Sequence, residues 1–66
     1  MNQDFENKYL GEIEYQKDKT RWVATQIDKD TVFMRKIDKH ESFYMSLQHF
    51  KDAISEDRFR EISIKL

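Results

Sequence analysis

Five segments of the chain have the residue pattern of β-strands. They are residues 9–15, 20–27, 31–37, 42–46 and 60–66. In the first and the last, apolar and polar residues alternate with a period of two, which is typical of a strand that buries one face. The three middle segments are rich in β-branched and aromatic residues, which favour strands over helices. The pattern therefore predicts a mainly β protein.

Between the fourth and the fifth segments the apolar residues change to a helical spacing. Leu47, Phe50 and Ile54 lie three and four residues apart, and Ser46 before them is a favourable N-cap. The polar residues 55–57 interrupt this stripe, so we expect a short helix of about two or three turns. The predicted order of elements is β-β-β-β-α-β.

The tripeptide Ile-Asp-Lys occurs twice, at residues 27–29 and 37–39. A repeat at this distance is typical of a meander of short antiparallel strands, in which each copy ends one strand and enters a hairpin loop. Neither copy is followed by Asn-Gly or Asp-Gly, the dipeptides of tight two-residue turns. We expect loops of about three to five residues, with Asp30 or His40 at positive φ.

The length of 66 residues allows one domain. We expect residues 1–8 to form a flexible N-terminal segment and residues 9–66 a single small β-rich domain. Aromatic residues make up 14% of the chain, and their large buried areas supply the apolar surface that such a small core needs.

Composition also narrows the cell compartment and the partners. The chain has no cysteine, and its first residues lack the basic and apolar regions of a signal peptide. No apolar run approaches the ~18 residues of a membrane span. We therefore expect a cytoplasmic protein with no membrane partner. The net charge of −1 argues against a generic nucleic-acid binder, which is usually basic, and against an acidic DNA mimic.

Four meandering strands, a helical turn and a closing strand over residues 9–66 resemble the small Src-homology-3-like barrels, including the KOW-type modules. The resemblance implies a five-stranded antiparallel barrel, although the glycine of the KOW loop has no counterpart here. The alternative is a twisted antiparallel sheet with the helix packed across one face. In size, charge balance and lack of cysteine, the chain also resembles phage or mobile-element accessory proteins, which modulate host machinery.

The second and third strands are apolar on both faces, and a small barrel can bury only one of them. If the loop between these strands has an odd length, one face carries Val23, Ile27, Phe33 and Ile37. The other face then carries Trp22, Ala24, Val32 and Met34. A loop of even length mixes the two sets, because a slip of one residue reverses every side chain.

This surplus of apolar residues predicts a surface that binds another protein, since Trp, Tyr and Met are enriched at interfaces. The predicted interface consists of Trp22, Val32, Met34 and Tyr44, with Lys29 and Lys39 at its charged rim. We expect an adaptor or inhibitor that occludes a site on a larger host or cognate protein. A homodimer would use the same residues. The competing interpretation is that the N-terminal segment or the helix covers this face.

Basic residues among the aromatic ones leave a second interpretation open. Single-stranded nucleic acid or RNA would be bound by stacking on the rings and by charge. The basic residues in question are Lys17, Lys19, Arg21, Arg35 and Lys36. Acidic residues interleave with them, which reduces the uncompensated charge on which phosphate affinity depends.

Catalysis and metal binding find little support. Ser46, His49 and Asp52 recur at intervals of three residues, but helix capping explains Ser46, and so small a domain leaves little room for an oxyanion hole and a substrate cleft. Only two histidines and no cysteine are available as metal ligands. We expect no enzymatic activity, no metal ion and no other cofactor.

Overall fold

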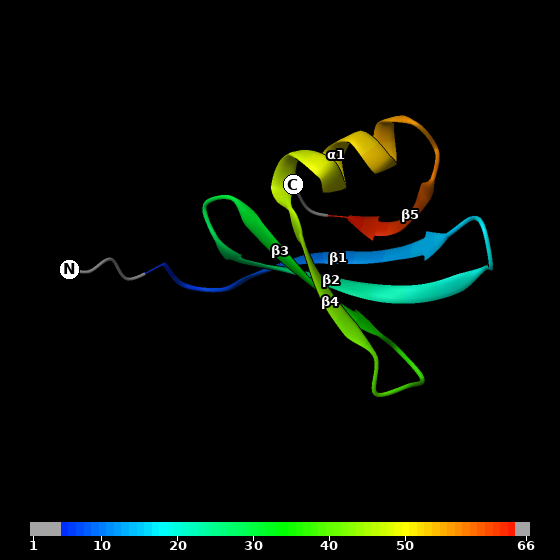
Figure 1. Ribbon diagram of the computed structural model, residues 1–66, viewed down its shortest axis with the longest axis horizontal. Coiled ribbons are helices and arrows are strands. Elements are labelled where there is room, and N and C mark those ends of the chain that lie inside the picture. The colour runs from blue at the N-terminus through cyan, green and yellow to red at the C-terminus, as the bar shows by residue number, and fades with distance from the viewer. Residues whose placement is uncertain (1–4, 65–66) are drawn as a thin grey trace.

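The computed structural model describes residues 5–64, which form an antiparallel five-stranded sheet and a helix (Figure 1). The elements are β1 (Lys8–Tyr15), β2 (Thr20–Asp28), β3 (Thr31–Lys36), β4 (Ser42–Ser46), α1 (Leu47–Ser55) and β5 (Phe59–Ile64). The predicted β class and element order are confirmed. Leu66, which the sequence places in the last strand, lies outside the described residues. The division into a flexible segment at 1–8 and a domain at 9–66 stays a prediction.

The strands lie in the order β4-β3-β2-β1-β5. β4 and β5 are therefore the two edges, three strands apart, and α1 connects them across one side of the sheet (Figure 1). The sheet is open, so of the two predicted architectures the structure shows the twisted sheet with a helix on one face. Within residues 5–64, no helix is long and apolar enough to span a membrane.

The β2–β3 hairpin sets which residues share a face. Ala24 pairs with Met34 and Thr25 with Phe33, and the register shifts by one residue between Gln26 and Asp28. The turn between the strands contains residues 29–30 alone, so the expectation of a longer loop is wrong here. The extra residue at the register shift produces the same grouping of faces as a loop of odd length.

Positive φ values also fall elsewhere than expected. Among the non-glycine residues of 5–64, Lys19 has φ 63° and Asp57 has φ 62°, whereas Asp30 and His40 do not adopt this conformation. Lys19 ends the β1–β2 turn and Asp57 follows α1, so the left-handed residues mark the first hairpin and the helix end. The turns around the repeated Ile-Asp-Lys do not need them.

The core lies between α1 and one face of the sheet, which we call the helix-side face. The core residues are Leu10, Ile13, Ala24, Val32, Met34, Phe50, Ala53 and Phe59. The helix begins where predicted, because the Ser46 hydroxyl accepts a hydrogen bond from the His49 backbone N–H at 3.0 Å. The cap fixes the start of α1, and with this start Phe50 and Ala53 lie on the side of the helix that faces the strands, where both are fully buried.

The burial of the helix-side face corrects the predicted interface. Val32 and Met34 are 0% exposed, and Trp22 is half-buried against the core. Val32 and Met34 cannot offer a free surface, because α1 packs on their face rather than on the opposite one, whereas Trp22 keeps part of its surface exposed. The competing interpretation, that the helix covers this face, is what the structure shows. Tyr44, by contrast, pairs with Phe33 on the other side of the sheet and is 65% exposed.

Candidate protein-binding surface

The face of the sheet opposite α1, the open face, is covered by no other element of residues 5–64. Tyr9, Thr25, Phe33 and Tyr44 are successive register partners across β1, β2, β3 and β4. We call these residues the aromatic row. The Phe33 and Tyr44 rings lie 5.1 Å apart between centroids with a tilt of 49°, a favourable aromatic contact. Tyr9 is 53% exposed, so both ends of the row reach solvent.

Beside the aromatic row runs a second line of register partners, in which Val23 pairs with Arg35 and Arg35 with Ser42. Arg35 is exposed, and none of the ion pairs within residues 5–64 involves it. Ile37 continues this apolar surface beyond the end of β3. Its backbone N–H donates to the Arg21 carbonyl at 3.1 Å, which holds it beside β2, and its side chain is 38% exposed. The β3–β4 side of the open face is thus apolar, with one unpaired guanidinium.

The β1–β5 side of the same face is charged and internally paired. Arg60 contacts Glu14 at 3.0 Å, and Arg21 lies 3.9 Å from Glu12. A hydrogen bond from Gln16, followed by one from Arg60, lowers the pKa of Glu14 below its usual value. Because these charges satisfy one another, this side has less to offer a partner than the aromatic row.

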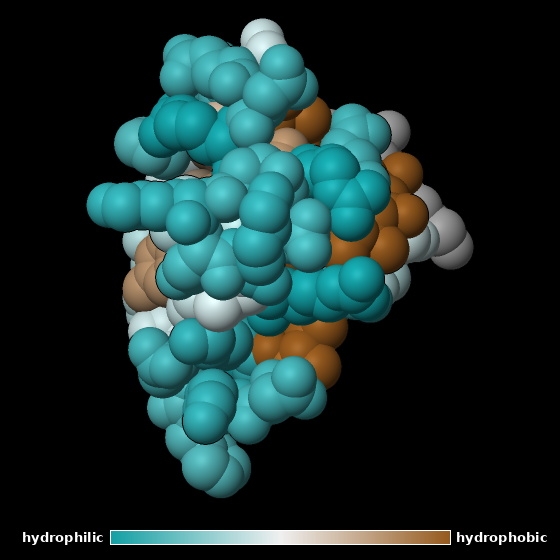
Figure 2. All heavy atoms as spheres, turned by 90° about the vertical axis from the view of Figure 1, so that its right-hand side faces the viewer, coloured by the Kyte–Doolittle hydropathy of each residue, from teal (hydrophilic) through white to brown (hydrophobic). Residues whose placement is uncertain are grey.

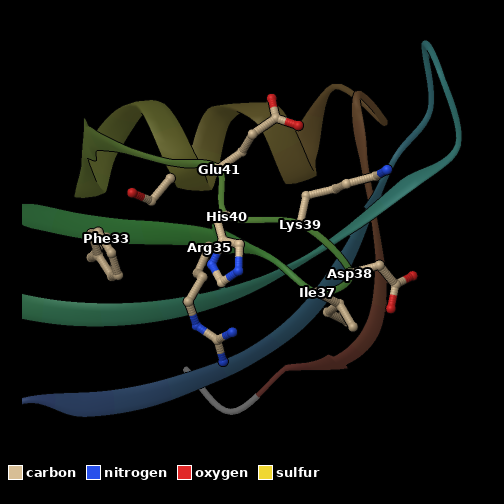
Figure 3. Close-up of a pocket in the computed structure, with 8 residues that line it drawn as sticks. Phe33, Arg35, Ile37, Asp38, Lys39, His40 and Glu41 are labelled. Carbon is tan, nitrogen blue, oxygen red and sulfur yellow. The ribbon is translucent and has the colours of Figure 1, made fainter.

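A shallow hollow of about 480 Å³ lies at the end of the β3–β4 hairpin. Its lining residues are Phe33, Arg35, Ile37, Asp38, Lys39, His40, Glu41 and Ser42 (Figure 3). In Figure 3 Phe33, Arg35 and Ile37 project to the same side of β3, whereas Glu41 projects to the other. The hollow therefore combines apolar walls with a guanidinium that is able to bind a carboxylate.

A second recess, of about 320 Å³, lies on the helix-side face beside α1, and His49 of α1 is among its lining residues. Trp22 and Phe43 meet edge to face at 5.1 Å, and Met34 and Met45 also line it. The Trp22 indole N–H donates to the Thr20 hydroxyl at 2.8 Å, which donates to Asp18 at 2.6 Å. Trp22 is thus held in place from within the chain.

The predicted basic residues are only partly brought together. A hollow of about 390 Å³ is lined by Lys19, Thr20, Arg21, Lys36, Asp38 and Lys39. We call it the basic hollow. Lys17 and Arg35 do not line it. Lys36 is partly neutralised, because its ammonium group contacts Glu41 at 3.1 Å and lies 5.7 Å from the centre of the Trp22 ring.

The remaining sequence candidates have simple structural roles. Ser46 caps α1, and Asp52 accepts a hydrogen bond from the Gln48 amide at 3.0 Å. Lys29 lies exposed in the β2–β3 turn and Lys39 in the β3–β4 turn. Residues 5–64 contain no group of three or more His, Asp and Glu side chains that is arranged to hold a metal ion.

Sequence reasoning grouped Val23, Ile27, Phe33 and Ile37 on one face and placed the predicted interface on the other. Tyr44, which it assigned to that interface with Trp22, Val32 and Met34, lies on the open face beside Phe33.

Tyr9 and Arg35 were not predicted to belong to a protein interface. Strict alternation along β3 places Arg35 on the same side as Phe33, but along β1 it would place Tyr9 with Gly11 and Ile13 on the helix-side face. The register shift between Tyr9 and Gly11 moves Tyr9 to the open face, and the isolated Gly11 was the signal that could have indicated it. Figure 2 shows one end of the molecule, where hydrophilic residues cover most of the surface and the most hydrophobic residues appear mainly along one margin.

Comparison with protein-family models, curated proteins and solved structures gives no match. The function therefore has to be argued from the geometry of the surface.

Proposed function

We propose that this chain is a small non-enzymatic protein-binding module of the cytoplasm, which acts as an adaptor or inhibitor by occluding a site on a larger protein. The observation that carries the proposal is the uncovered aromatic row, with Tyr9 and Tyr44 more than half exposed. Rows of exposed aromatic residues on a rigid sheet are costly to leave in water and are typical of protein interfaces.

The chemistry of the surface defines the partner. Apolar side chains of the partner would pack against Phe33, Tyr44 and Ile37. A carboxylate of the partner would pair with Arg35, which forms no ion pair within residues 5–64. Lys39 lies at the margin of the same hollow and adds positive charge to the rim. The partner surface should therefore be apolar with an acidic residue next to the apolar contact.

The test compares capture of proteins from a host lysate by the parent chain and by a Tyr44→Ser chain. A specific partner should bind the parent, and calorimetry with the purified partner should show affinity reduced about 30-fold by Tyr44→Ser, as expected for an aromatic hot spot worth about 2 kcal/mol. Arg35→Ser should weaken the same complex.

Lys51→Ser is the matched control, because Lys51 is exposed on α1 on the other side of the molecule. Its circular dichroism and its partner affinity should equal those of the parent. If every captured protein binds the Tyr44→Ser and Arg35→Ser chains as tightly as the parent, the open face is not the binding surface and the proposal fails.

The basic hollow favours a second candidate function, the binding of single-stranded nucleic acid. Lys19, Arg21 and Lys39 surround it together with Lys36, which adjoins the Trp22 ring. Phosphates would lie in the hollow and a base would stack near Trp22. Fluorescence titration with oligonucleotides over a salt series tests this: micromolar affinity that falls steeply with salt, and that Lys39→Ser reduces, would favour it over the first proposal.

A further inference from the structure

The outer edge of β4 presents backbone groups that pair with no other strand of residues 5–64. The Lys36 N–H donates to the Glu41 carbonyl at 2.9 Å, and the Leu47 N–H donates to the Asp30 carbonyl at 2.7 Å. Hydrogen-bonded pairs recur at every second residue of an antiparallel ladder, so Phe43 and Met45 bond to β3. The backbone N–H and C=O groups of Ser42 and Tyr44 therefore point away from the sheet.

The two edges of the sheet differ in how well they are protected against pairing. β5 carries the adjacent charges Arg60 and Glu61, and its register against β1 is interrupted beyond them. Charges and bulges of this kind keep edge strands from adding another strand. β4, with the sequence Ser-Phe-Tyr-Met-Ser, has no charge, no proline and no interruption of its register against β3.

We propose that β4 pairs antiparallel with β4 of a second copy of this chain, about a two-fold axis at Tyr44. Tyr44 is the middle residue of β4, so this register pairs the whole strand with its copy. Tyr44 then exchanges both backbone hydrogen bonds with Tyr44 of the second copy, and Phe43 lies opposite Met45. A two-fold axis requires a surface that complements itself, and an uncharged strand with a free edge satisfies this condition.

The side chains support a copy of the same strand as the occupant. Phe43 is 39% exposed and Tyr44 65% exposed, and both would lose contact with water on pairing. Opposite Phe43, the Met45 sulfur would contact an aromatic ring, a favourable combination. The two-fold axis stands perpendicular to the sheet, so both open faces lie on the same side and the two aromatic rows join into one. This inference stands independently of the proposed function, because it rests on the backbone edge.

Sedimentation analysis tests the pairing by charge exchange at the axis. The parent chain should change from monomer to dimer between about 10 µM and 1 mM, the affinity range of a small interface. Tyr44→Lys and Tyr44→Glu chains should each dimerise at least tenfold more weakly, because like charges then lie opposite each other. An equimolar mixture of the two chains should regain a dimer, since opposite charges meet at the axis.

Ser63→Lys is the control, because it adds the same charge on β5, the other edge, and should leave the dimer unchanged. A second measurement needs no substitution: the Tyr44 amide of the parent should exchange rapidly with solvent at low concentration and become protected at high concentration. A parent that stays monomeric, a mixture that stays monomeric, or a Tyr44 amide that exchanges equally fast at all concentrations would overturn the proposal. Pairing of β4 with a foreign peptide strand alone would also overturn it.

Discussion

Gly11 of β1 lies so close to the edge strand β5 that there is no room for a side chain. Its φ is +140°, and a Cβ built there would lie 1.7 Å from the Ser63 carbonyl oxygen of β5. The contact is with backbone, so it is relieved only by moving β5 away from β1. Glycine is therefore required here both for conformation and for space.

We predict that Gly11→Ala unfolds most of the protein. Backbone strain of about 1–3 kcal/mol adds to the displacement of β5, and a domain of this size has a total stability near the low end of ~5–15 kcal/mol. Urea denaturation followed by Trp22 fluorescence measures the loss. Ser63→Ala, which removes the Ser63 hydroxyl but keeps the carbonyl that a Cβ at position 11 would meet, should change the midpoint little. An unaltered midpoint for Gly11→Ala would contradict the close approach.

Asp18, in the turn between β1 and β2, makes the stability of the protein depend on pH. Its carboxylate accepts hydrogen bonds from the Thr20 hydroxyl at 2.6 Å and the Thr20 N–H at 3.1 Å. The hydroxyl bond is the main reason that the pKa of Asp18 lies below its usual value of 3.8. A lowered folded-state pKa means that the stabilisation is present above the unfolded-state pKa and is lost as the pH falls through the folded-state value.

Asp18→Asn should therefore flatten the acid side of the stability profile. Asparagine keeps an oxygen acceptor for Thr20 but does not titrate, so the loss of stability between about pH 5 and pH 2 should be smaller than in the parent. Urea midpoints at several pH values give the comparison. Asp38→Asn is the control, since Asp38 lies exposed in the other long turn. Parallel profiles for parent and Asp18→Asn would count against the Thr20 interaction.

At the scale of elements, the sequence was sufficient to predict the order of strands and helix along the chain. It was not sufficient to predict which face of the sheet the helix covers. The period-two segments and the stripe of Leu47, Phe50 and Ile54 located the strands and the helix within one or two residues. For β2 and β3 the sequence left two groupings of residues open, and the structure shows the one expected for a loop of odd length, which the register shift between Gln26 and Asp28 produces. The face that the helix covers was not predictable, because Val23 and Phe33 are as apolar as Ala24 and Val32, and their periodicity is the same.

Successive substitutions in β3 measure which face is the core. Met34→Ala should cost about 2–5 kcal/mol, because a fully buried side chain leaves a cavity. Phe33→Ala should cost clearly less, since Phe33 is half-buried on the open face, and Arg35→Ala should stay within about 0.5 kcal/mol. Chemical denaturation of the three chains gives the order. A larger loss for Phe33→Ala than for Met34→Ala would reverse the assignment of the faces.

At the scale of the molecule, one buried cluster joins four strands to the helix. It takes residues from β1, β2, β3, β5 and α1, while Met45 of β4 packs against it. The sheet is open, so its stability depends on α1 covering the helix-side face rather than on closure of a barrel. Sequence could not distinguish these outcomes, because both use the same order of elements and differ only in whether the edge strands meet.

The dependence on α1 predicts that the molecule unfolds as one unit. Phe50→Ala removes the largest side chain that α1 contributes to the cluster and should cost about 3–5 kcal/mol, which approaches the whole stability of a small domain. Trp22 fluorescence and far-ultraviolet circular dichroism should report the same midpoint, as expected for a two-state transition. Lys51→Ala, one residue along the helix and exposed, should leave that midpoint almost unchanged. If Phe50→Ala abolished the helix signal while the Trp22 environment and the strand signal persisted, the sheet would be stable without its cover. The helix-side face would then be a usable binding surface after all.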